Sequence, residues 1–220
     1  MSDLQEVVQG TPEWFALRCG KITGTRFADV LAMSKPSKKN PEPRPLKARD
    51  DLIWTLATER TQGYQPQGLT SYSLKWGTDN EPRAREAYEL RTGAFVTQQG
   101  FITHDTLSFV GVSLDGLVDD DGTIEIKAPK CPEIHLRRFL EGVPEEYKPQ
   151  IQGGLWTSKR KWCDFVSYDP DTDARFKLLI IRVYRDEEYI KNLERECLVL
   201  EDEVHELMRK LLAKVENNHG

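Results

Sequence analysis

FVGVSLDGLVDDDGTIEIKAPK, residues 109–130, is the stretch that decides the fold. Two short apolar runs flank a turn of Asp and Gly, which is the usual sequence sign of a β-hairpin. Each run also carries charge where a buried strand normally carries none. Asp115 interrupts the first run, and Glu125 and Lys127 interrupt the second. The stretch therefore predicts a hairpin whose charged side chains meet at one place.

The length of the turn predicts which charges meet. If the loop is residues 119–121 and Gly122 adopts a positive φ, Val118 pairs with Gly122 and Asp115 pairs with Glu125. The lysine two residues after Glu125 lies on the same face, because side chains alternate along a strand. Opposed carboxylates repel, so we expect a cation between them, and a divalent metal serves better than one lysine.

This cluster is typical of a nuclease site. Carboxylate ligands without His or Cys indicate Mg²⁺, with Mn²⁺ as a substitute. Beside such a metal, Lys127 can help to activate a water or stabilise negative charge on a phosphate. The alternative is a solvated hairpin with an ordinary ion pair, because a D…ExK pattern arises by chance in a chain of 30% charged residues.

Length and composition indicate one α/β domain over residues 1–220, soluble and cytoplasmic, since the N-terminus has no signal-peptide pattern and no membrane segment is evident. The four cysteines and four histidines form no CxxC and no zinc spacing, which argues against a disulfide framework and a Cys/His metal site. The net charge is −5, yet residues 35–50 hold six Lys/Arg against two acids. Basic segments of this kind support a nucleic-acid partner or are ordinary solvated surface.

The remaining pattern predicts a central mixed β-sheet flanked by helices. A short helix with the apolar face Phe27, Val30 and Leu31 should follow a cap at residues 23–25, and a loop should cover residues 34–47. We expect the other helices at about 12–19, 50–62, 81–92, 132–140, 145–158 and 187–216, and two strands at 162–169 and 177–185.

The last of these helices carries an apolar stripe from Ile190 to Leu211 at spacings of three and four residues. We expect this stripe to pack on the sheet. The opposite face is rich in acids, which include Glu201, Glu203 and Glu206. An acidic face repels DNA, so we expect it to lie on the outer side of the molecule, where a partner protein can bind.

Six blocks occur in one order along the chain: WFALRCGKITGTRF, LKWGTDNEPRAR, GVSLDGL, IEIKAP, YKPQIQGGLW and FVSYDP. In these blocks the sequence resembles the phage lambda-type exonucleases, the viral recombinase exonucleases of the D…(D/E)xK nuclease superfamily. The resemblance implies a restriction-endonuclease-like core and a homotrimeric ring, or toroid, that encloses double-stranded DNA. It also implies Mg²⁺-dependent 5′-to-3′ degradation to mononucleotides in a phage or prophage. The product is a 3′ overhang for a single-strand annealing protein.

The resemblance also implies roles for individual residues. Asp115, Glu125 and the main-chain carbonyl of Ile126 match metal ligands, Glu81 completes the acidic cluster, and Lys127 matches the catalytic lysine. Without the family match and the neighbouring Trp-Gly, the better interpretation of the acid at position 81 is an acid in the first turn of its helix, stabilised by the helix dipole.

A second set of residues matches contacts to the 5′-phosphate: Arg18, Thr25, Ser113 and Gln150. An arginine beside a helix start with a hydroxyl is also, chemically, an anion pocket. Threonine stands at position 25 where the family pattern has serine. Leu74 matches an apolar wedge that opens the DNA end, although an isolated leucine is more often core. Trp14, Trp76 and Trp156 are assigned to packing.

Other functions stay open from the sequence. One is another D…(D/E)xK nuclease, such as a restriction-type endonuclease, or an iron–sulfur nuclease, against which the absence of a cysteine cluster counts. Another is a non-catalytic DNA-end-binding recombination scaffold. The presence of all four acid and lysine positions favours an enzyme.

Overall fold

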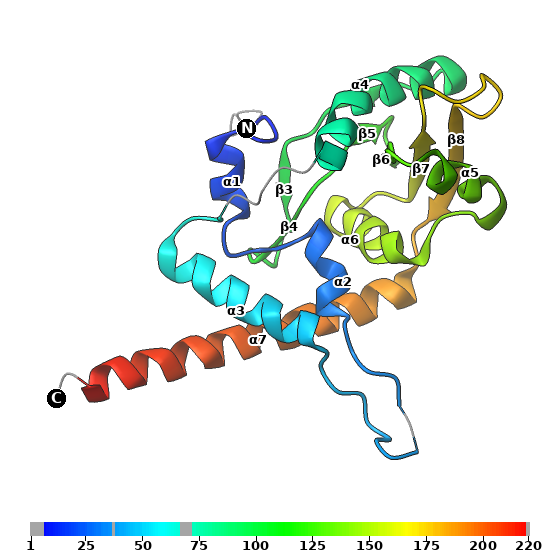
Figure 1. Cartoon of the computed structure of the whole chain (residues 1–220). Helices are drawn as coiled ribbons and strands as arrows, with labels where there is room; N and C mark the ends of the chain where they lie inside the picture. Colours follow the sequence, from blue (N-terminus) through cyan, green and yellow to red (C-terminus); the bar gives the residue numbers. More distant parts are fainter. Residues whose placement is uncertain (1–6, 37, 67–71, 219–220) are drawn as a thin grey trace.

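The computed structural model describes residues 7–36, 38–66 and 72–218, which form a mixed α/β fold (Figure 1). The elements in chain order are α1 (Pro12–Arg18), β1 (Ile22–Thr23), η1 (Gly24–Arg26), α2 (Phe27–Val30), α3 (Lys47–Gln62), α4 (Tyr72–Thr92), β2 (Val96–Thr97), β3 (Phe101–Thr103), β4 (Val110–Ser113), β5 (Gly116–Val118), β6 (Gly122–Lys127), α5 (Pro132–Glu141), η2 (Glu145–Tyr147), α6 (Lys148–Ser158), β7 (Trp162–Tyr168), β8 (Leu178–Tyr184) and α7 (Glu187–Asn218).

The strands form two mixed sheets. One has the order β2-β5-β6-β7-β8 and the other the order β1-β4-β3. Two pairs are parallel, β6 with β7 and β1 with β4, and the remaining pairs are antiparallel. The chain passes from one sheet to the other between β4 and β5, through Leu114 and Asp115. The predicted α/β class with flanking helices is confirmed.

Two helices cover opposite faces of the five-stranded sheet, as Figure 1 shows for α4 and α6. Ala84 and Tyr88 of α4 pack against the β6 residues Ile124 and Ile126. On the other face, α6 packs against β7. Because side chains alternate along β6, Glu125 and Lys127 point to the α6 face. The hairpin thus buries its apolar residues under one helix and presents its charges towards the other.

The predicted hairpin register is confirmed, since Val118 pairs with Gly122 and Gly116 with Ile124. The predicted positive φ at Gly122 is wrong, because Asp119 takes it instead, at 44°. Glycine is required at position 122 for space. A Cβ there would lie 2.1 Å from the ring of Trp162 on β7.

The predicted start of α4 near Glu81 is also wrong. The helix begins at Tyr72 and continues through Pro82, so Glu81 lies in its middle and not in its first turn. A proline inside a helix removes a backbone hydrogen bond. The burial of Ala84 and Tyr88 on the sheet offsets this cost. The predicted end at Gly93, in the left-handed region, is correct.

The apolar stripe of α7 is buried from Ile190 to Val204, whereas Leu211 is exposed. The main contacts of α7 are the helices α2, α3 and α6, not the sheet. Leu193 and Leu200 of α7 share a core with Leu52 and Leu56 of α3. The expectation that the stripe packs on the sheet was therefore wrong. The register of hydrophobic residues predicted a buried face but could not identify what covers it.

The acidic face of α7 is likewise only partly on the outside. Glu201 is 8% exposed and forms an ion pair with Arg60 of α3, at 2.7 Å. Glu203 forms one with Arg49, at 3.1 Å, and Arg49 is 1% exposed. The prediction that Glu201 faces outwards was wrong, because Arg60 of α3 holds it as a partner, whereas the Glu203 side chain is 38% exposed although it pairs with Arg49. Within the described ranges, no helix combines the length and apolar character needed to cross a lipid bilayer.

Candidate active site

Three elements bring the predicted acids together. Asp115 lies in the link between β4 and β5, Glu125 and Lys127 lie on β6, and Glu81 comes from α4. Asp115 Oδ2 accepts a hydrogen bond of 2.6 Å from the backbone N–H of Ile126. This bond fixes the Asp115 carboxylate against β6, next to Glu125. The structure therefore places the four predicted catalytic residues, and Ile126 with its predicted carbonyl ligand, in one neighbourhood.

Glu125 is the centre of the cluster and is 3% exposed. Its Oε1 accepts a hydrogen bond from Lys127 Nζ and another, of 2.7 Å, from Gln150 Nε2 on α6. Burying a carboxylate in this way requires such donors, because an unpaired buried charge is costly. Strand β6 and helix α6 are thus linked through one carboxylate oxygen of Glu125.

The charges in the cluster perturb one another. Burial first, and then the Glu125 carboxylate, raise the pKa of Asp115 well above its usual range. Burial also raises the pKa of Glu81, although the Arg85 guanidinium opposes this shift. For Lys127, burial alone would lower the pKa, but the carboxylates of Glu125 and Asp115 outweigh it and raise the pKa above its usual value. The cluster has a surplus of negative charge that one lysine does not neutralise.

This donor set fits a hard divalent cation in its chemistry. It offers carboxylate oxygens and the main-chain carbonyl of Ile126, the ligand types that Mg²⁺ prefers, and the surplus of negative charge would be relieved by a cation. As they stand, the carboxylates are engaged by protein donors. In the part of the chain that the structure describes, no three Asp, Glu, His or Cys side chains enclose a metal-sized space.

Beside the acids lies a cationic cluster around Arg18, the Arg18 cluster. Arg18, the last residue of α1, donates to Ser113 Oγ at 3.2 Å and to Thr23 Oγ1 at 3.3 Å. Its guanidinium lies 4.2 Å from the ring centroid of Trp14, whose Nε1 donates to Ser113 Oγ at 2.9 Å. Burial, followed by the charge of Arg26, lowers the pKa of Arg18 to about 10, so Arg18 remains a cation at neutral pH. A held cation with two hydroxyl groups is suited to an anion.

The structure divides the four residues predicted to bind phosphate. Arg18 and Ser113 are in contact, whereas Gln150 contacts Glu125 of the acid cluster. Thr25 is exposed in the single turn η1, and none of its hydrogen bonds in the described residues reaches Arg18. The threonine whose hydroxyl contacts Arg18 is Thr23 and not, as predicted, Thr25. The predicted second helix is short, so Thr23 contacts Arg18 instead of capping a longer helix.

Sequence reasoning missed Thr23 and Trp14, the second of which was assigned to packing alone. The spacing of Trp14 and Arg18, one helical turn apart on α1, was the available signal, because such residues share a face. Trp156 is buried in the core, as predicted. The side chain of Leu74 lies outside the described residues, so its predicted role as a wedge stays a prediction.

Aromatic side chains also approach the site from α4. Lys130, three residues after Lys127, lies with its Nζ 4.0 Å from the ring centroid of Trp76 and 5.0 Å from that of Tyr72. Trp76, assigned to packing, therefore has a cation on its ring. The contact ties the first turns of α4 to the chain that leaves β6.

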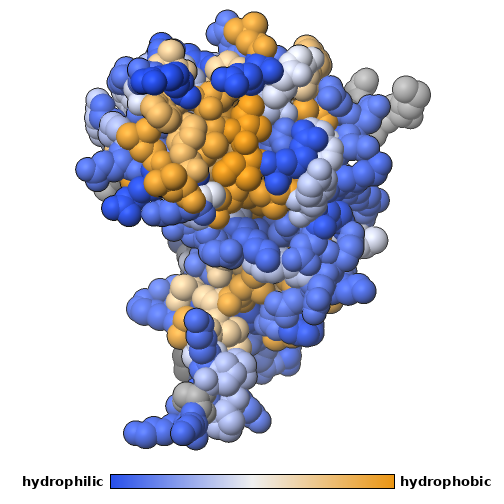
Figure 2. All heavy atoms as spheres, turned by 90° about the vertical axis from the view of Figure 1, so that its right-hand side faces the viewer, coloured by the Kyte–Doolittle hydropathy of each residue, from blue (hydrophilic) through white to orange (hydrophobic). Residues whose placement is uncertain are grey.

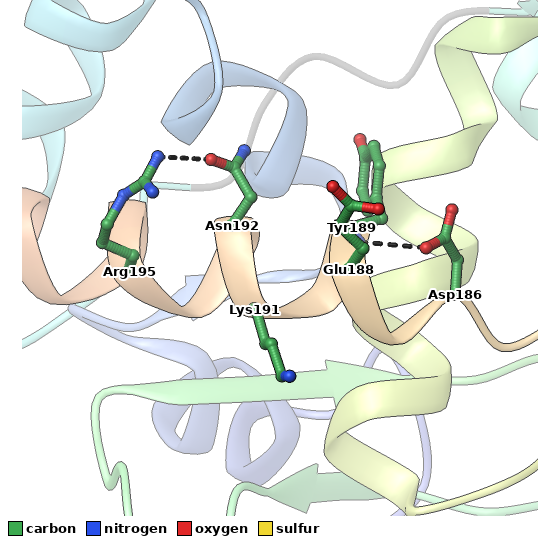
Figure 3. Close-up of a pocket in the computed structure, with 6 residues that line it drawn as sticks. All are labelled: Asp186, Glu188, Tyr189, Lys191, Asn192 and Arg195. Atoms are coloured by element: carbon green, nitrogen blue, oxygen red, sulfur yellow. Dashed lines mark hydrogen bonds between the residues drawn. The ribbon is translucent and has the colours of Figure 1, made fainter.

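A hollow elsewhere on the surface is a weaker candidate for a catalytic site. It lies along the first turns of α7, has a volume of about 510 Å³, and is lined by Asp186, Glu188, Tyr189, Lys191, Asn192 and Arg195 (Figure 3). Two of its charged groups are engaged locally: Arg195 donates to Asn192 Oδ1 at 2.5 Å, and Asp186 accepts from the Tyr189 N–H at 3.0 Å. The acid cluster is therefore the better candidate for chemistry.

Comparison with known proteins identifies the family of the chain. The family model described as a YqaJ-like viral recombinase domain matches residues 13–161, which include every predicted site residue. An alkaline exonuclease (LHK-Exo) from Laribacter hongkongensis is 35% identical and has a TM-score of 0.83. The match covers 94% of this chain and 99% of that chain. The same protein in complex with dAMP matches equally well.

A phage related exonuclease from Haemophilus somnus 129PT shows the same fold at 15% identity. Its TM-score is 0.69, over 87% of this chain and 96% of that chain. No curated protein matches the sequence. The family model covers more than half of the chain, and the Laribacter exonuclease is similar over almost its whole length. The resemblance seen in the six sequence blocks is thus confirmed, and the chain belongs to the YqaJ-like viral recombinase domain family.

Proposed function

We propose that the chain is a metal-dependent exonuclease that degrades the 5′-ended strand of linear double-stranded DNA and leaves a 3′ overhang for recombination. The family supports a nuclease that acts in recombination, and the similarity to an alkaline exonuclease supports attack at DNA ends. The observation that carries the proposal is the position of the Arg18 cluster beside the acid cluster. Ser113 belongs to the Arg18 cluster and Asp115 belongs to the acid cluster, and the two residues are two positions apart in the sequence.

The separation of the two sites suits an exonuclease. Ser113 ends β4 and Asp115 lies in the link to β5, which places the Arg18 cluster next to the acids without merging the two. If Arg18 and Ser113 hold the 5′-terminal phosphate, a neighbouring phosphodiester lies within reach of the cluster. Cleavage at that bond releases mononucleotides. A cluster that prefers a terminal phosphate also explains why a DNA end would be required.

The acids of the cluster would hold the metal: Asp115, Glu125 and Glu81, with the main-chain carbonyl of Ile126. Bound there, Mg²⁺ or Mn²⁺ would supply positive charge against the phosphate oxygens and the attacking water. Lys127, whose pKa is raised, is charged at neutral pH. It therefore acts as a hydrogen-bond donor to charge that develops on the phosphate.

Assembly and partners belong to the same proposal: a homotrimeric ring around the DNA, a single-strand annealing protein, and a phage or prophage context in the cytoplasm of a bacterial host. An apolar surface on the side that carries α5 and β8 supports association with further copies (Figure 2). On α5 the side chains of Ile134, Leu136 and Leu140 are exposed, as is that of Phe176, which precedes β8.

The experiment compares three substrates in Mg²⁺: a linear duplex labelled at one 5′ end, the same duplex labelled at one 3′ end, and a covalently closed circle. The proposal expects early release of the 5′ label as mononucleotide, late release of the 3′ label, and an intact circle. Cleavage of the circle would identify an endonuclease. Binding to linear DNA without cleavage would identify a non-catalytic end-binding protein.

A further inference from the structure

Arg85 connects three segments at the edge of the acid cluster. Its Nη2 donates to Glu81 Oε1 at 2.6 Å, one helical turn earlier on α4, and lies 3.4 Å from the main-chain oxygen of Asp115. With the Gln98 amide oriented so that its oxygen faces the guanidinium, that oxygen accepts from Nη1 at 3.0 Å and from Nη2 at 3.2 Å. One side chain thus spans α4, the β4–β5 link and the β2–β3 link.

This arrangement exceeds what a helix pair needs for stability. An ion pair at i and i+4 stabilises an exposed helix by only about 0.5 kcal/mol or less. Here the Arg85 side chain is 12% exposed, and its Nε is buried without a partner among the described residues. A buried unsatisfied donor has an energetic cost. Local helix stability therefore does not account for an arginine at this position.

The electrostatics of the cluster give Arg85 a task. Glu81 is a flexible side chain, 31% exposed, and it lies close enough to the carboxylates of Glu125 and Asp115 to be repelled by both. Without a restraint, this repulsion would turn Glu81 towards solvent. The guanidinium opposes it from a fixed place, because its other contacts lie on the strand side of the cluster.

We propose that Arg85 is a positioning residue for the nuclease reaction: it holds the Glu81 carboxylate at a set distance from the chain segment that carries Asp115. The inference rests on the proposed function, since it assigns Glu81 to the reaction. Charge alone does not suffice for this role. The planar guanidinium can reach Glu81, the Asp115 carbonyl and Gln98 together, whereas a lysine presents a single ammonium group that cannot span all three.

The test is the variant Arg85→Lys, which keeps the positive charge and replaces the planar guanidinium by a single ammonium group. With 5′-phosphorylated linear duplex in Mg²⁺, kcat should fall about tenfold while KM for DNA changes less than about twofold. The melting temperature should change little. Arg83→Ala is the matched control, because Arg83 is an exposed arginine of the same helix; its kcat and KM should equal those of the wild type.

A double-mutant cycle separates positioning from a structural effect. In a Glu81→Gln background, Arg85→Lys should change the residual single-turnover rate less than about twofold, because its partner carboxylate is already absent. Mg²⁺ affinity is measured by calorimetry for the wild type, the two single variants and the double variant. This measurement remains informative for a variant that no longer cleaves DNA. The affinity should weaken with Arg85→Lys only when Glu81 is present.

Three results would overturn the inference: wild-type kcat in Arg85→Lys, an equal loss of rate in both backgrounds, or an equal loss of Mg²⁺ affinity in both. Failure of the proposed function looks different, because the wild-type protein itself would then leave the linear duplex intact.

Discussion

Gln150 on α6 donates a hydrogen bond of 2.7 Å to Glu125 on β6, at the same carboxylate oxygen that accepts from Lys127. This contact links the helix to the centre of the acid cluster. The family resemblance had suggested a phosphate contact for Gln150. In the structure its amide instead donates to a carboxylate of the acid cluster. A substitution at Gln150 should therefore affect the rate of the reaction before it affects phosphate binding.

Gln150→Ala should therefore lower kcat about tenfold and leave the preference for 5′-phosphorylated ends in place. Gln150→Glu should be more severe, because it puts a second carboxylate next to Glu125. Steady-state rates on phosphorylated and unphosphorylated duplexes measure both effects. Gln62→Ala, at the exposed end of α3, is the control. If Gln150→Ala instead lost the preference for 5′-phosphorylated ends and kept a normal kcat, Gln150 would be a phosphate contact, as the family resemblance implies.

Asp115 and Lys127 should differ when each is replaced by alanine. Asp115→Ala should lose Mg²⁺ binding and turnover together, whereas Lys127→Ala should bind Mg²⁺ and lose the rate, because the lysine is a donor and not a ligand. Calorimetry and nuclease assays on both variants make the comparison. Lys161→Ala, at the far end of the hairpin, is the control. EDTA should abolish wild-type activity, and excess Mg²⁺ or Mn²⁺ should restore it; activity that survives EDTA contradicts the assignment.

Arg18 should control recognition of the DNA end. Arg18→Ala removes the cation that Ser113 and Thr23 hold in place. The ratio of kcat/KM between 5′-phosphorylated and 5′-hydroxyl duplex should fall at least about tenfold, the usual size of a lost charge-assisted contact. Arg195→Ala on α7 should leave the ratio unchanged. An unchanged ratio in Arg18→Ala would place the phosphate elsewhere.

Arg49 should matter for stability and not for the reaction. It is buried, and its partners are Glu196 at 3.4 Å and Glu203 at 3.1 Å, both on α7. Arg49→Ala removes a buried side chain, takes this partner from Glu203 and leaves Glu196 its pair with Arg195, so the free energy of unfolding should fall by about 3 kcal/mol. Urea unfolding measures this loss. Lys47→Ala, which breaks an exposed pair on the same helix, should cost less than about 1 kcal/mol. Equal effects would show that the α3–α7 ion pairs contribute little.

The sequence by itself determined the hairpin and its charges. Alternation along a strand is a local property with a period of two residues, so the pairing of Val118 with Gly122 followed from the loop length. The same pattern put Glu125 and Lys127 on one face. Glycine and proline signals likewise located the ends of several helices, because caps depend on neighbouring residues only. The family match depended on the same local blocks.

Tertiary structure decided the contacts between distant segments. Glu81 lies mid-helix because burial of α4 on the sheet outweighs the helix-breaking effect of Pro82. Glu201 faces inward because it pairs with Arg60, which is 141 residues away in sequence. Local periodicity records which residues are buried, whereas the partner of a buried charge depends on which surfaces pack together. That choice is a property of the whole folded chain, set by the energetic cost of leaving any buried charge unpaired.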